Sequence, residues 1–270
     1  MKLKQCLLRF LLLLSAAGML LAGCHSSIPA GTAGTTSPVT ETASPTAATS
    51  EASVPPTETT PPPPETTPGP VCPLSLEDWR LQLVNQDHPI SADVTIEMTH
   101  VRSGIYVDSR CYDDLIAMLD ACRAEGLSPL VCSGYRDLEY QTELFRNKVH
   151  RLRMEGMTEE EAQRLAQTIV ALPGTSEHHI GLAVDIVDET YQQLTEQQEL
   201  TAVQQWLISH CWEYGFILRY PNGKSDITKI IYEPWHYRYV GQEVAAEIQR
   251  SGLCMEEYLA QFRPKGDSAG

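Results

Sequence analysis

A segment rich in proline, serine and threonine over residues 25–71 is the strongest constraint on how this chain can fold. It holds 11 of the 18 prolines, 18 serines and threonines, four glutamates, and no lysine, arginine or aromatic residue. Such a composition cannot bury enough apolar surface to offset the entropy lost on ordering the backbone. We therefore expect residues 24–71 to form a disordered tether and residues 72–270 to form the folded domain.

Residues 1–23 have the pattern of an export signal. Lys2, Lys4 and Arg9 precede an apolar stretch over residues 10–22 that ends in small residues. This stretch is shorter than the roughly 20 residues of a simple bilayer span. The sequence Leu-Ala-Gly-Cys that ends at Cys24 resembles the lipobox of bacterial lipoproteins. That resemblance implies a lipidated Cys24 and an extracytoplasmic protein anchored to the bacterial cell membrane; the alternative is an ordinary secretory signal with an incidental cysteine.

The charge of the chain argues against one class of partner. Twenty lysines and arginines against 35 aspartates and glutamates give a formal net charge of −15. An acidic chain repels phosphate backbones, so we expect no nucleic-acid partner. We also expect a monomer.

The domain over residues 72–270 alternates helical and extended patterns, which favours an α+β fold with a small central antiparallel sheet flanked by helices. Thr158 with Glu161 forms a capping box that predicts a helix running to about residue 170. The apolar periodicity predicts further helices over residues 109–125, 206–214 and 240–250, and strands over residues 130–132, 182–187, 216–219 and 229–232.

Six cysteines remain in the domain. An exported chain permits disulfides, but no CxxC motif is present, so neither a thioredoxin-type site nor a zinc–thiolate cluster is indicated. Four of the cysteines occupy core-like periodic positions and are expected as small buried hydrophobic residues: Cys111, Cys122, Cys132 and Cys211.

Two stretches carry residue types suited to metal chemistry. In the first, Leu182 and its alternating neighbours face one side of the predicted strand, so that Asp185 faces the other side, and His178 lies on the turn before it. In the second, Glu233 and His236 lie close enough in sequence to share one site. Two histidines and one carboxylate leave a fourth position open, as in a catalytic zinc site. Taken singly, each of these residues also has an ordinary structural alternative, such as a core histidine, a cap or a strand end.

Several separated motifs occur in the order that is typical of one family, which favours a functional site over chance. The pattern S-x-H-x-x-G-x-A-x-D from Ser176 to Asp185, followed by E-P-W-H from Glu233, resembles the VanY-like zinc D-alanyl-D-alanine carboxypeptidases. A third block, SGYR over residues 133–136 with Gln141, and a tail over residues 237–241 match as well. The resemblance covers about residues 79–260.

This resemblance implies an LAS-type zinc peptidase fold and a defined set of roles. It implies one Zn²⁺ ion, with Glu233 as general base and acid and Arg136 as the cation for the developing oxyanion or for the substrate's terminal carboxylate. A structural ion pair with Asp137 is the alternative for Arg136. Members of the family often have serine at the position of Asp137, which puts substrate preference in doubt. The implied metal ligands are His178, Asp185 and His236, and the implied substrate-binding residues are Gln141, Ser176, Ser133 and Tyr135.

The leading hypothesis is therefore a tethered zinc carboxypeptidase that removes the C-terminal D-amino acid of peptidoglycan stem peptides at the cell envelope. An L,D-carboxypeptidase and a peptidoglycan endopeptidase of the same fold remain alternatives. A non-catalytic cell-wall binding module is a third, but such a module needs neither Glu233 nor Arg136.

Overall fold

The computed structural model describes residues 71–91 and 94–262. The predicted signal peptide over residues 1–23, the lipidation site Cys24 and the predicted tether up to residue 70 lie outside the described residues. Across the described ranges, no helix combines the length and the hydropathy needed to cross a bilayer.

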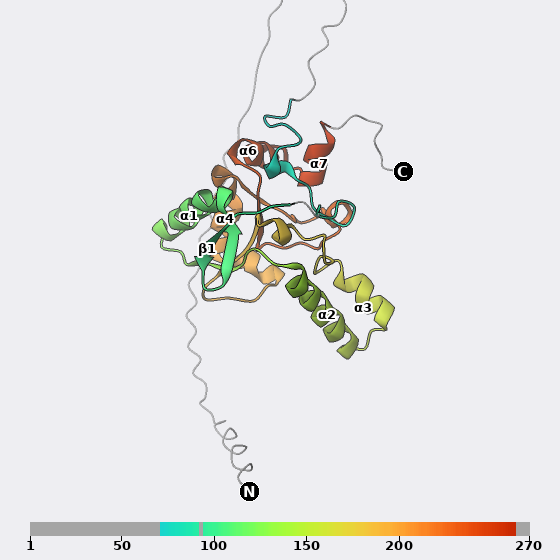
Figure 1. Ribbon diagram of the computed structural model, residues 1–270. Coiled ribbons are helices and arrows are strands. Elements are labelled where there is room, and N and C mark those ends of the chain that lie inside the picture. The colour runs from blue at the N-terminus through green and yellow to red at the C-terminus, as the bar shows by residue number, and fades with distance from the viewer. Residues whose placement is uncertain (1–70, 92–93, 263–270) are drawn as a thin grey trace, which may run out of the picture. The chain divides into compact units, whose positions relative to one another are not determined.

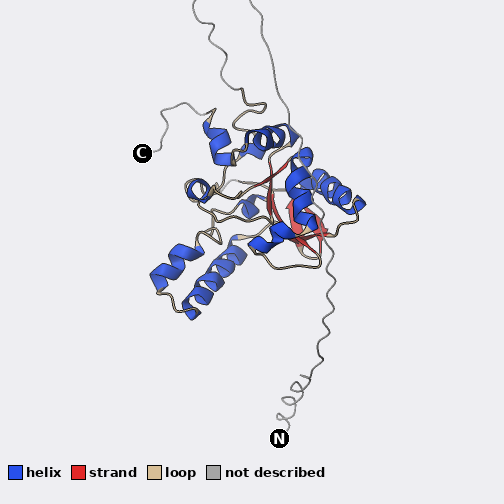
Figure 2. Ribbon diagram, turned by 180° about the vertical axis from the view of Figure 1, so that it is seen from behind, coloured by secondary structure: helices blue, strands red, loops and turns tan. Residues whose placement is uncertain are grey.

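The centre of the domain is a four-stranded antiparallel sheet with the strand order β3-β4-β6-β5 (Figure 2). Strands β4 and β6 occupy the middle of this sheet. A separate antiparallel hairpin, β1-β2, lies beside α1 (Figure 1). The strands are β1 (Met98–Arg102), β2 (Ile105–Asp108), β3 (Pro129–Ser133), β4 (Ala183–Asp188), β5 (Phe216–Leu218) and β6 (His236–Tyr239).

Helices surround the sheet, and α2 and α3 pair as a hairpin that projects from it (Figure 1). This arrangement confirms the predicted α+β class with a small antiparallel sheet. The α-helices are α1 (Ser109–Ala124), α2 (Leu138–Met154), α3 (Glu159–Ala166), α4 (Ala202–His210), α5 (Ser225–Thr228), α6 (Gln242–Ser251) and α7 (Met255–Ala260). The 3-10 helices are η1 (Trp79–Leu81), η2 (Glu177–Ile180), η3 (Glu196–Leu200) and η4 (Cys211–Tyr214).

Alternation along β4 separates the core from the site. Leu182, Val184 and Ile186 are all buried in the main apolar cluster, together with Leu115 of α1 and Phe216 of β5. The side chains between them therefore face the opposite side of the sheet, as the sequence pattern predicts. This places Asp185 on the face away from the main core.

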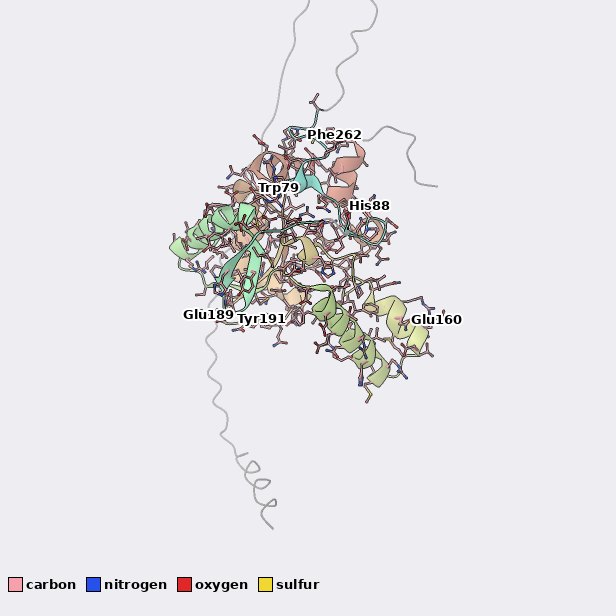
Figure 3. The ribbon with its side chains drawn as sticks, in the orientation of Figure 1. Trp79, His88, Glu160, Glu189, Tyr191 and Phe262 are labelled. Atoms are coloured by element: carbon pink, nitrogen blue, oxygen red, sulfur yellow. The ribbon has the colours of Figure 1, made fainter. Side chains whose placement is uncertain are left out.

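The residues that precede β1 pack against the sheet as well. Leu81 belongs to an apolar cluster formed mainly by α6 and α7, and Val84 belongs to the main cluster. Trp79, which is labelled in Figure 3, stacks on Tyr239 of β6 with 6.0 Å between ring centroids. The guanidinium of Arg238 donates to the carbonyls of Arg80 and Gln82 at 3.1 and 2.8 Å.

Four predicted elements differ from the structure. The predicted helix over residues 206–214 is divided, since α4 already begins at Ala202 and the chain from Cys211 to Tyr214 forms the 3-10 helix η4. The predicted strand over residues 229–232 is absent, because Lys229 ends α5 in the left-handed region (φ +62°) and the next amides are not paired with a strand; the backbone N–H of Ile231 instead donates to Thr168. Helix α3 has the predicted capping box but ends at Ala166, before the β-branched run over residues 168–170. Helix α6 begins at Gln242 because Gly241 has a φ of +81°.

Candidate metal centre

Two adjacent strands and one short helix bring three potential metal ligands together. Asp185 of β4 and His236 of β6 are direct cross-strand partners, so their side chains leave the sheet on the same face. His178 comes from η2, one turn before β4. Gly181 ends η2 with a φ of +67°, which lets the chain reverse into the strand.

The three side chains converge on one point. Nε2 of His178 lies 3.4 Å from Oδ2 of Asp185, and Nδ1 of His236 lies 3.1 Å from Oδ1 of Asp185. One ligand atom from each of the three lies within 4.8 Å of the others, and all three residues are buried. This is the donor set of a four-coordinate zinc site with one position open to a reactant.

The hydrogen bonding of His178 supports the fit to a metal ion. Nδ1 of His178 lies 2.7 Å from the carbonyl oxygen of Gly134, so it carries the proton and Nε2 keeps its lone pair. That Nε2 is buried and has no hydrogen-bond partner among the described residues. Burial and the nearby Arg136 lower the pKa of His178 to about 4, which keeps the ring neutral, as a metal ligand must be.

Glu177 lies behind His236. Its Oε2 is 3.7 Å from Nε2 of His236, on the side of the ring opposite to Asp185. Two buried guanidiniums hold the same carboxylate: Nε of Arg219 at 2.7 Å and Nη1 of Arg238 at 2.8 Å, both on Oε1. Burial raises the pKa of Glu177, but the two arginines outweigh it, and the pKa falls well below its ordinary value. Glu177 is therefore an ionised carboxylate beside Nε2 of His236, and neither its Oε2 nor that Nε2 has a hydrogen-bond partner among the described residues. A carboxylate in this place favours the orientation of the ring in which Nδ1 faces the metal position.

Sequence reasoning assigned no role to Glu177, although it lies inside the recognised motif. Its partner Arg219 lies outside the motifs, and so does Glu256, which Arg219 binds through two nitrogens at 2.9 and 2.6 Å. The sequence offered one signal for Glu177, namely a charged residue directly before a proposed metal ligand.

Glu233 lies on the open side of the site. Its Oε2 is 3.7 Å from Nδ1 of His236, and its backbone N–H donates to the carbonyl of Tyr220 at 3.1 Å. The side chain has no direct hydrogen bond to the other two candidate ligands. Burial raises the pKa of Glu233 to about 8, although His236 lowers it. A carboxylate with a pKa near neutrality suits both the acceptance and the return of a proton.

Arg136 lies beside the same ligands and does not pair with Asp137. Its Nη2 is 2.5 Å from Oδ2 of Asp185, and its Nε donates to Ser133 at 2.8 Å. Gln141 accepts from Nη1 at 3.4 Å, while its own amide donates to the carbonyl of Ala171. Asp137 instead caps α2 by accepting from the backbone N–H of Tyr140. Of the two alternatives for Asp137, capping the helix is what the geometry supports.

A cavity of about 680 Å³ contains the site. Of the residues predicted to bind substrate, Ser133, Gln141 and Ser176 line it, but Tyr135 does not. The Ser176 hydroxyl also accepts from the backbone N–H of His178, at the start of η2. The cavity thus joins all the predicted metal and catalytic residues: Arg136, His178, Asp185, Glu233 and His236.

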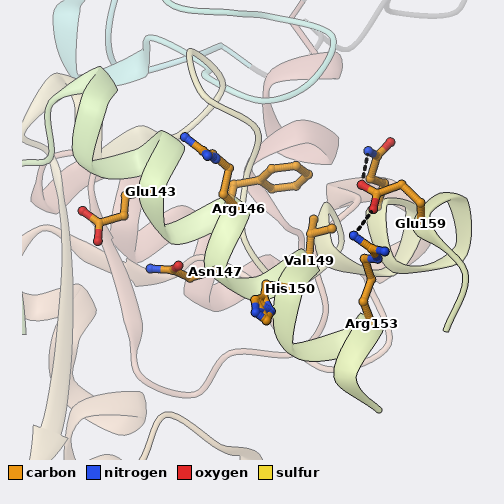
Figure 4. A pocket seen from close by; sticks show the side chains of 9 residues that line it. Glu143, Arg146, Asn147, Val149, His150, Arg153 and Glu159 are labelled. Atoms are coloured by element: carbon orange, nitrogen blue, oxygen red, sulfur yellow. Dashed lines mark hydrogen bonds and ion pairs between the residues drawn. The ribbon is translucent and has the colours of Figure 1, made fainter. Parts of the chain in front are cut away.

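A second hollow, of about 530 Å³, lies on the α2–α3 hairpin and contains no predicted site residue (Figure 4). Its walls include Glu143, Arg146 and His150 of α2. Arg153 of α2 forms an ion pair with Glu159 of α3 at 3.0 Å across it. This hollow lies on a different face of α2 from the residues that line the catalytic cavity.

The six described cysteines are all free thiols. Cys111, Cys122 and Cys211 are buried in the main core, as predicted. The prediction for Cys132 is wrong: its side chain is exposed and lines the catalytic cavity, because it alternates with the buried Val131 along β3.

Comparisons with known proteins agree with this geometry. Residues 104–242 match the profile of the family described as VanY: D-alanyl-D-alanine carboxypeptidase. The chain is 43% identical over 183 residues to a D-alanyl-D-alanine carboxypeptidase of Enterococcus faecalis; the match covers 68% of this chain and 66% of that protein. The chain thus spans somewhat less than two thirds of that curated relative.

Two solved structures match over nearly their whole lengths, each with 43% sequence identity. One is a variant of the vancomycin-resistance D,D-pentapeptidase VanY from a VanB-type cassette in complex with Zn(II); it gives a TM-score of 0.63 and covers 67% of this chain and 99% of that one. The other is VanYB in complex with D-alanine-D-alanine, with a TM-score of 0.64 and coverage of 69% and 100%.

Proposed function

Because the chain belongs to the VanY family of D-alanyl-D-alanine carboxypeptidases, we propose that its domain hydrolyses the C-terminal D-alanine from peptidoglycan stem peptides. One observation carries the proposal: His178, Asp185 and His236 converge on an open metal position, and Glu233 lies beside it in the same cavity. The solved relatives that bind Zn(II) and D-alanine-D-alanine support the choice of metal and substrate.

Each residue has a defined task in this reaction. His178, Asp185 and His236 hold one zinc ion, which supplies a Lewis acid for the scissile carbonyl and lowers the pKa of the attacking water. Glu233 accepts a proton from that water while the oxygen of the water bonds to the carbonyl carbon. Glu233 then delivers the proton to the leaving nitrogen as the C–N bond breaks, so that the carboxylate is regenerated.

Arg136 supplies positive charge beside the reacting carbonyl. The guanidinium of Arg136 lies next to Asp185, one of the proposed metal ligands. A carbonyl that is polarised by the metal therefore lies near this guanidinium, which stabilises the developing oxyanion. Ser133 and Gln141 hold this guanidinium in place through Nε and Nη1. We assign these two residues to the orientation of Arg136 as well as to the cavity wall. Tyr135, which does not line the cavity, keeps only the role that the family resemblance implies.

A substitution at Glu233 tests the proposal. The purified full chain, supplied with one equivalent of zinc, should release D-alanine from muramyl pentapeptide in a chelator-sensitive reaction. In Glu233→Gln, kcat should fall by about 10²–10⁴-fold while bound zinc stays at one equivalent, because a general acid–base group is lost and no ligand is removed.

Metal analysis of a second variant provides the control. Asp185→Ala should lose zinc together with activity, because it removes a proposed ligand. Full zinc occupancy in Asp185→Ala would remove Asp185 from the ligand set. Release of D-alanine from the tetrapeptide alone would indicate an L,D-carboxypeptidase instead.

We further propose that the enzyme works outside the cytoplasm and is anchored to the membrane by a lipid on Cys24. The support is the lipobox-like sequence before Cys24 and the proline-rich segment that follows it. A radiolabelled fatty acid should be incorporated into the wild-type chain in bacterial cells and not into Cys24→Ala. Equal labelling of both chains would contradict lipidation at this residue.

A further inference from the structure

One face of α2 extends the catalytic cavity away from the metal position. Gln141, Leu144, Lys148 and Arg151 are spaced by three, four and three residues, so they form one stripe along the helix, and all four line the cavity. Gln141 contacts Arg136 at the metal end. At 1.5 Å per residue, the stripe carries the cavity about 15 Å outward to Arg151.

Another part of the cavity lining is apolar. It includes Ile169 and Val170 from the segment after α3, and Ile230 and Ile231 from the segment after α5; Gln192, Gln193 and Thr195 add polar groups to the lining. A backbone hydrogen bond from Ile231 to Thr168 joins these two segments at 2.9 Å. One cavity is therefore lined by the helical stripe of α2, by these apolar residues and by the metal site, and we call its part beyond Gln141 the groove.

The outer end of this groove carries two cations that have no close ion-pair partner among the described residues. Lys148 is half-buried and Arg151 is exposed, and neither has an ion pair within 4 Å among residues 71–91 and 94–262. Glu155, one turn beyond Arg151, is the acidic side chain that acts on Lys148 through space. The only carboxylates that line the cavity, Asp185 and Glu233, lie at the metal end.

A half-buried cation without a close partner is costly unless a ligand supplies an anion. The groove therefore provides a site for a negatively charged group at a fixed distance from the reaction centre.

We propose that Lys148 and Arg151 bind a carboxylate that the substrate peptide carries on the N-terminal side of its scissile bond. The proposal rests on the proposed function and names a specificity determinant for it. An extended peptide advances about 3.3–3.6 Å per residue, so the groove accommodates about four residues beyond the scissile bond. In a stem pentapeptide, the second residue carries a carboxylate and lies three residues from the bond between the fourth and fifth residues, within reach of the two cations.

The test measures binding directly. Two stem pentapeptides are used as probes, identical except that the second residue carries either a free carboxylate or a carboxamide. Their Kd values are measured by calorimetry with the zinc-loaded full chain carrying Glu233→Gln, so that neither peptide is consumed. We expect the carboxylate form to bind about tenfold more tightly, and Lys148→Gln with Arg151→Gln added to reduce the ratio to near one.

Arg146 offers a matched control on another face of the same helix. Arg146→Gln removes one positive charge from α2 but changes the wall of the hairpin hollow instead of the catalytic cavity (Figure 4). This variant should keep the preference for the carboxylate. Unfolding curves of all variants identify any loss of preference that comes from misfolding, and in that case the single variants Lys148→Gln and Arg151→Gln replace the double variant.

Failure of the inference and failure of the proposed function look different. Equal Kd values for the two peptides in the chain with Lys148 and Arg151 intact, or an equal loss of preference in Arg146→Gln, would overturn the inference. Absence of D-alanine release by the wild-type chain would overturn the proposed function instead, and the ratio of Kd values would still decide the role of the two cations.

Discussion

Glu177 links the metal centre to a buried network of charges. It contacts His236 on one side and two buried arginines on the other, so its substitution should affect both metal binding and stability. Glu177→Gln should weaken zinc binding by about 10–100-fold, because the ring of His236 loses its orienting carboxylate. It should also lower the free energy of unfolding by about 3–5 kcal/mol, because Arg219 and Arg238 lose a buried counter-charge.

Glu256→Gln separates these two effects. Glu256 pairs with Arg219 but forms no ion pair or hydrogen bond with His236, so this variant should be less stable yet keep the zinc affinity of the wild-type chain. Zinc affinity is measured by competition with a chelator, and stability by urea denaturation. If both variants bind zinc as tightly as the wild-type chain does, Glu177 has only a structural role.

The turn between η2 and β4 controls the site at the scale of an element. Gly181 has a φ of +67°, and a Cβ atom there would lie 2.8 Å from the backbone nitrogen of Asp108. Gly181→Ala should therefore lower the free energy of unfolding by more than the roughly 1–3 kcal/mol of backbone strain alone. It should also lower activity, since His178 and Asp185 lie on either side of this turn.

Gly126→Ala is the matched control for this turn. Gly126 follows α1 with a φ of +79°, but a Cβ atom there meets nothing within 4 Å. Only backbone strain should destabilise this variant, and its activity should match that of the wild-type chain. Equal losses of stability in the two variants, measured by urea denaturation, would mean that the contact with Asp108 relaxes at no cost.

The segment before β1 is part of the domain at the scale of the whole molecule. Leu81 is 2% exposed and packs with residues of β5, α6 and α7, which are far from it in sequence. Leu81→Ala should lower the free energy of unfolding by about 2–5 kcal/mol in a single cooperative transition. Leu200→Ala, at a side chain that is 76% exposed, should change it by less than about 0.5 kcal/mol. A loss below about 1 kcal/mol for Leu81→Ala would show that this segment docks loosely.

Local patterns predicted much of the secondary structure. The helix predicted over residues 109–125 follows from its apolar periodicity, with Asp108 or Ser109 as its expected cap, and the structure has Asp108 in that place. The capping box of α3 follows from Thr158 and Glu161. The failures arose where a long-range contact or an unusual backbone angle decided the conformation. Ile231 bonds to Thr168 instead of to a strand, and Lys229 has a positive φ.

Sequence alone determined the family, the α+β class and the identity of the candidate ligands, because alternation in a strand and motif spacing are local properties. Only the tertiary structure decided what surrounds them. The cross-strand pairing of Asp185 with His236, the carboxylate of Glu177 behind His236 and the contact of Arg136 with Asp185 join residues up to 59 positions apart. The cationic end of the groove depends on how α2 lies against the segments after α3 and α5, and that packing arises from side-chain contacts that no local pattern encodes.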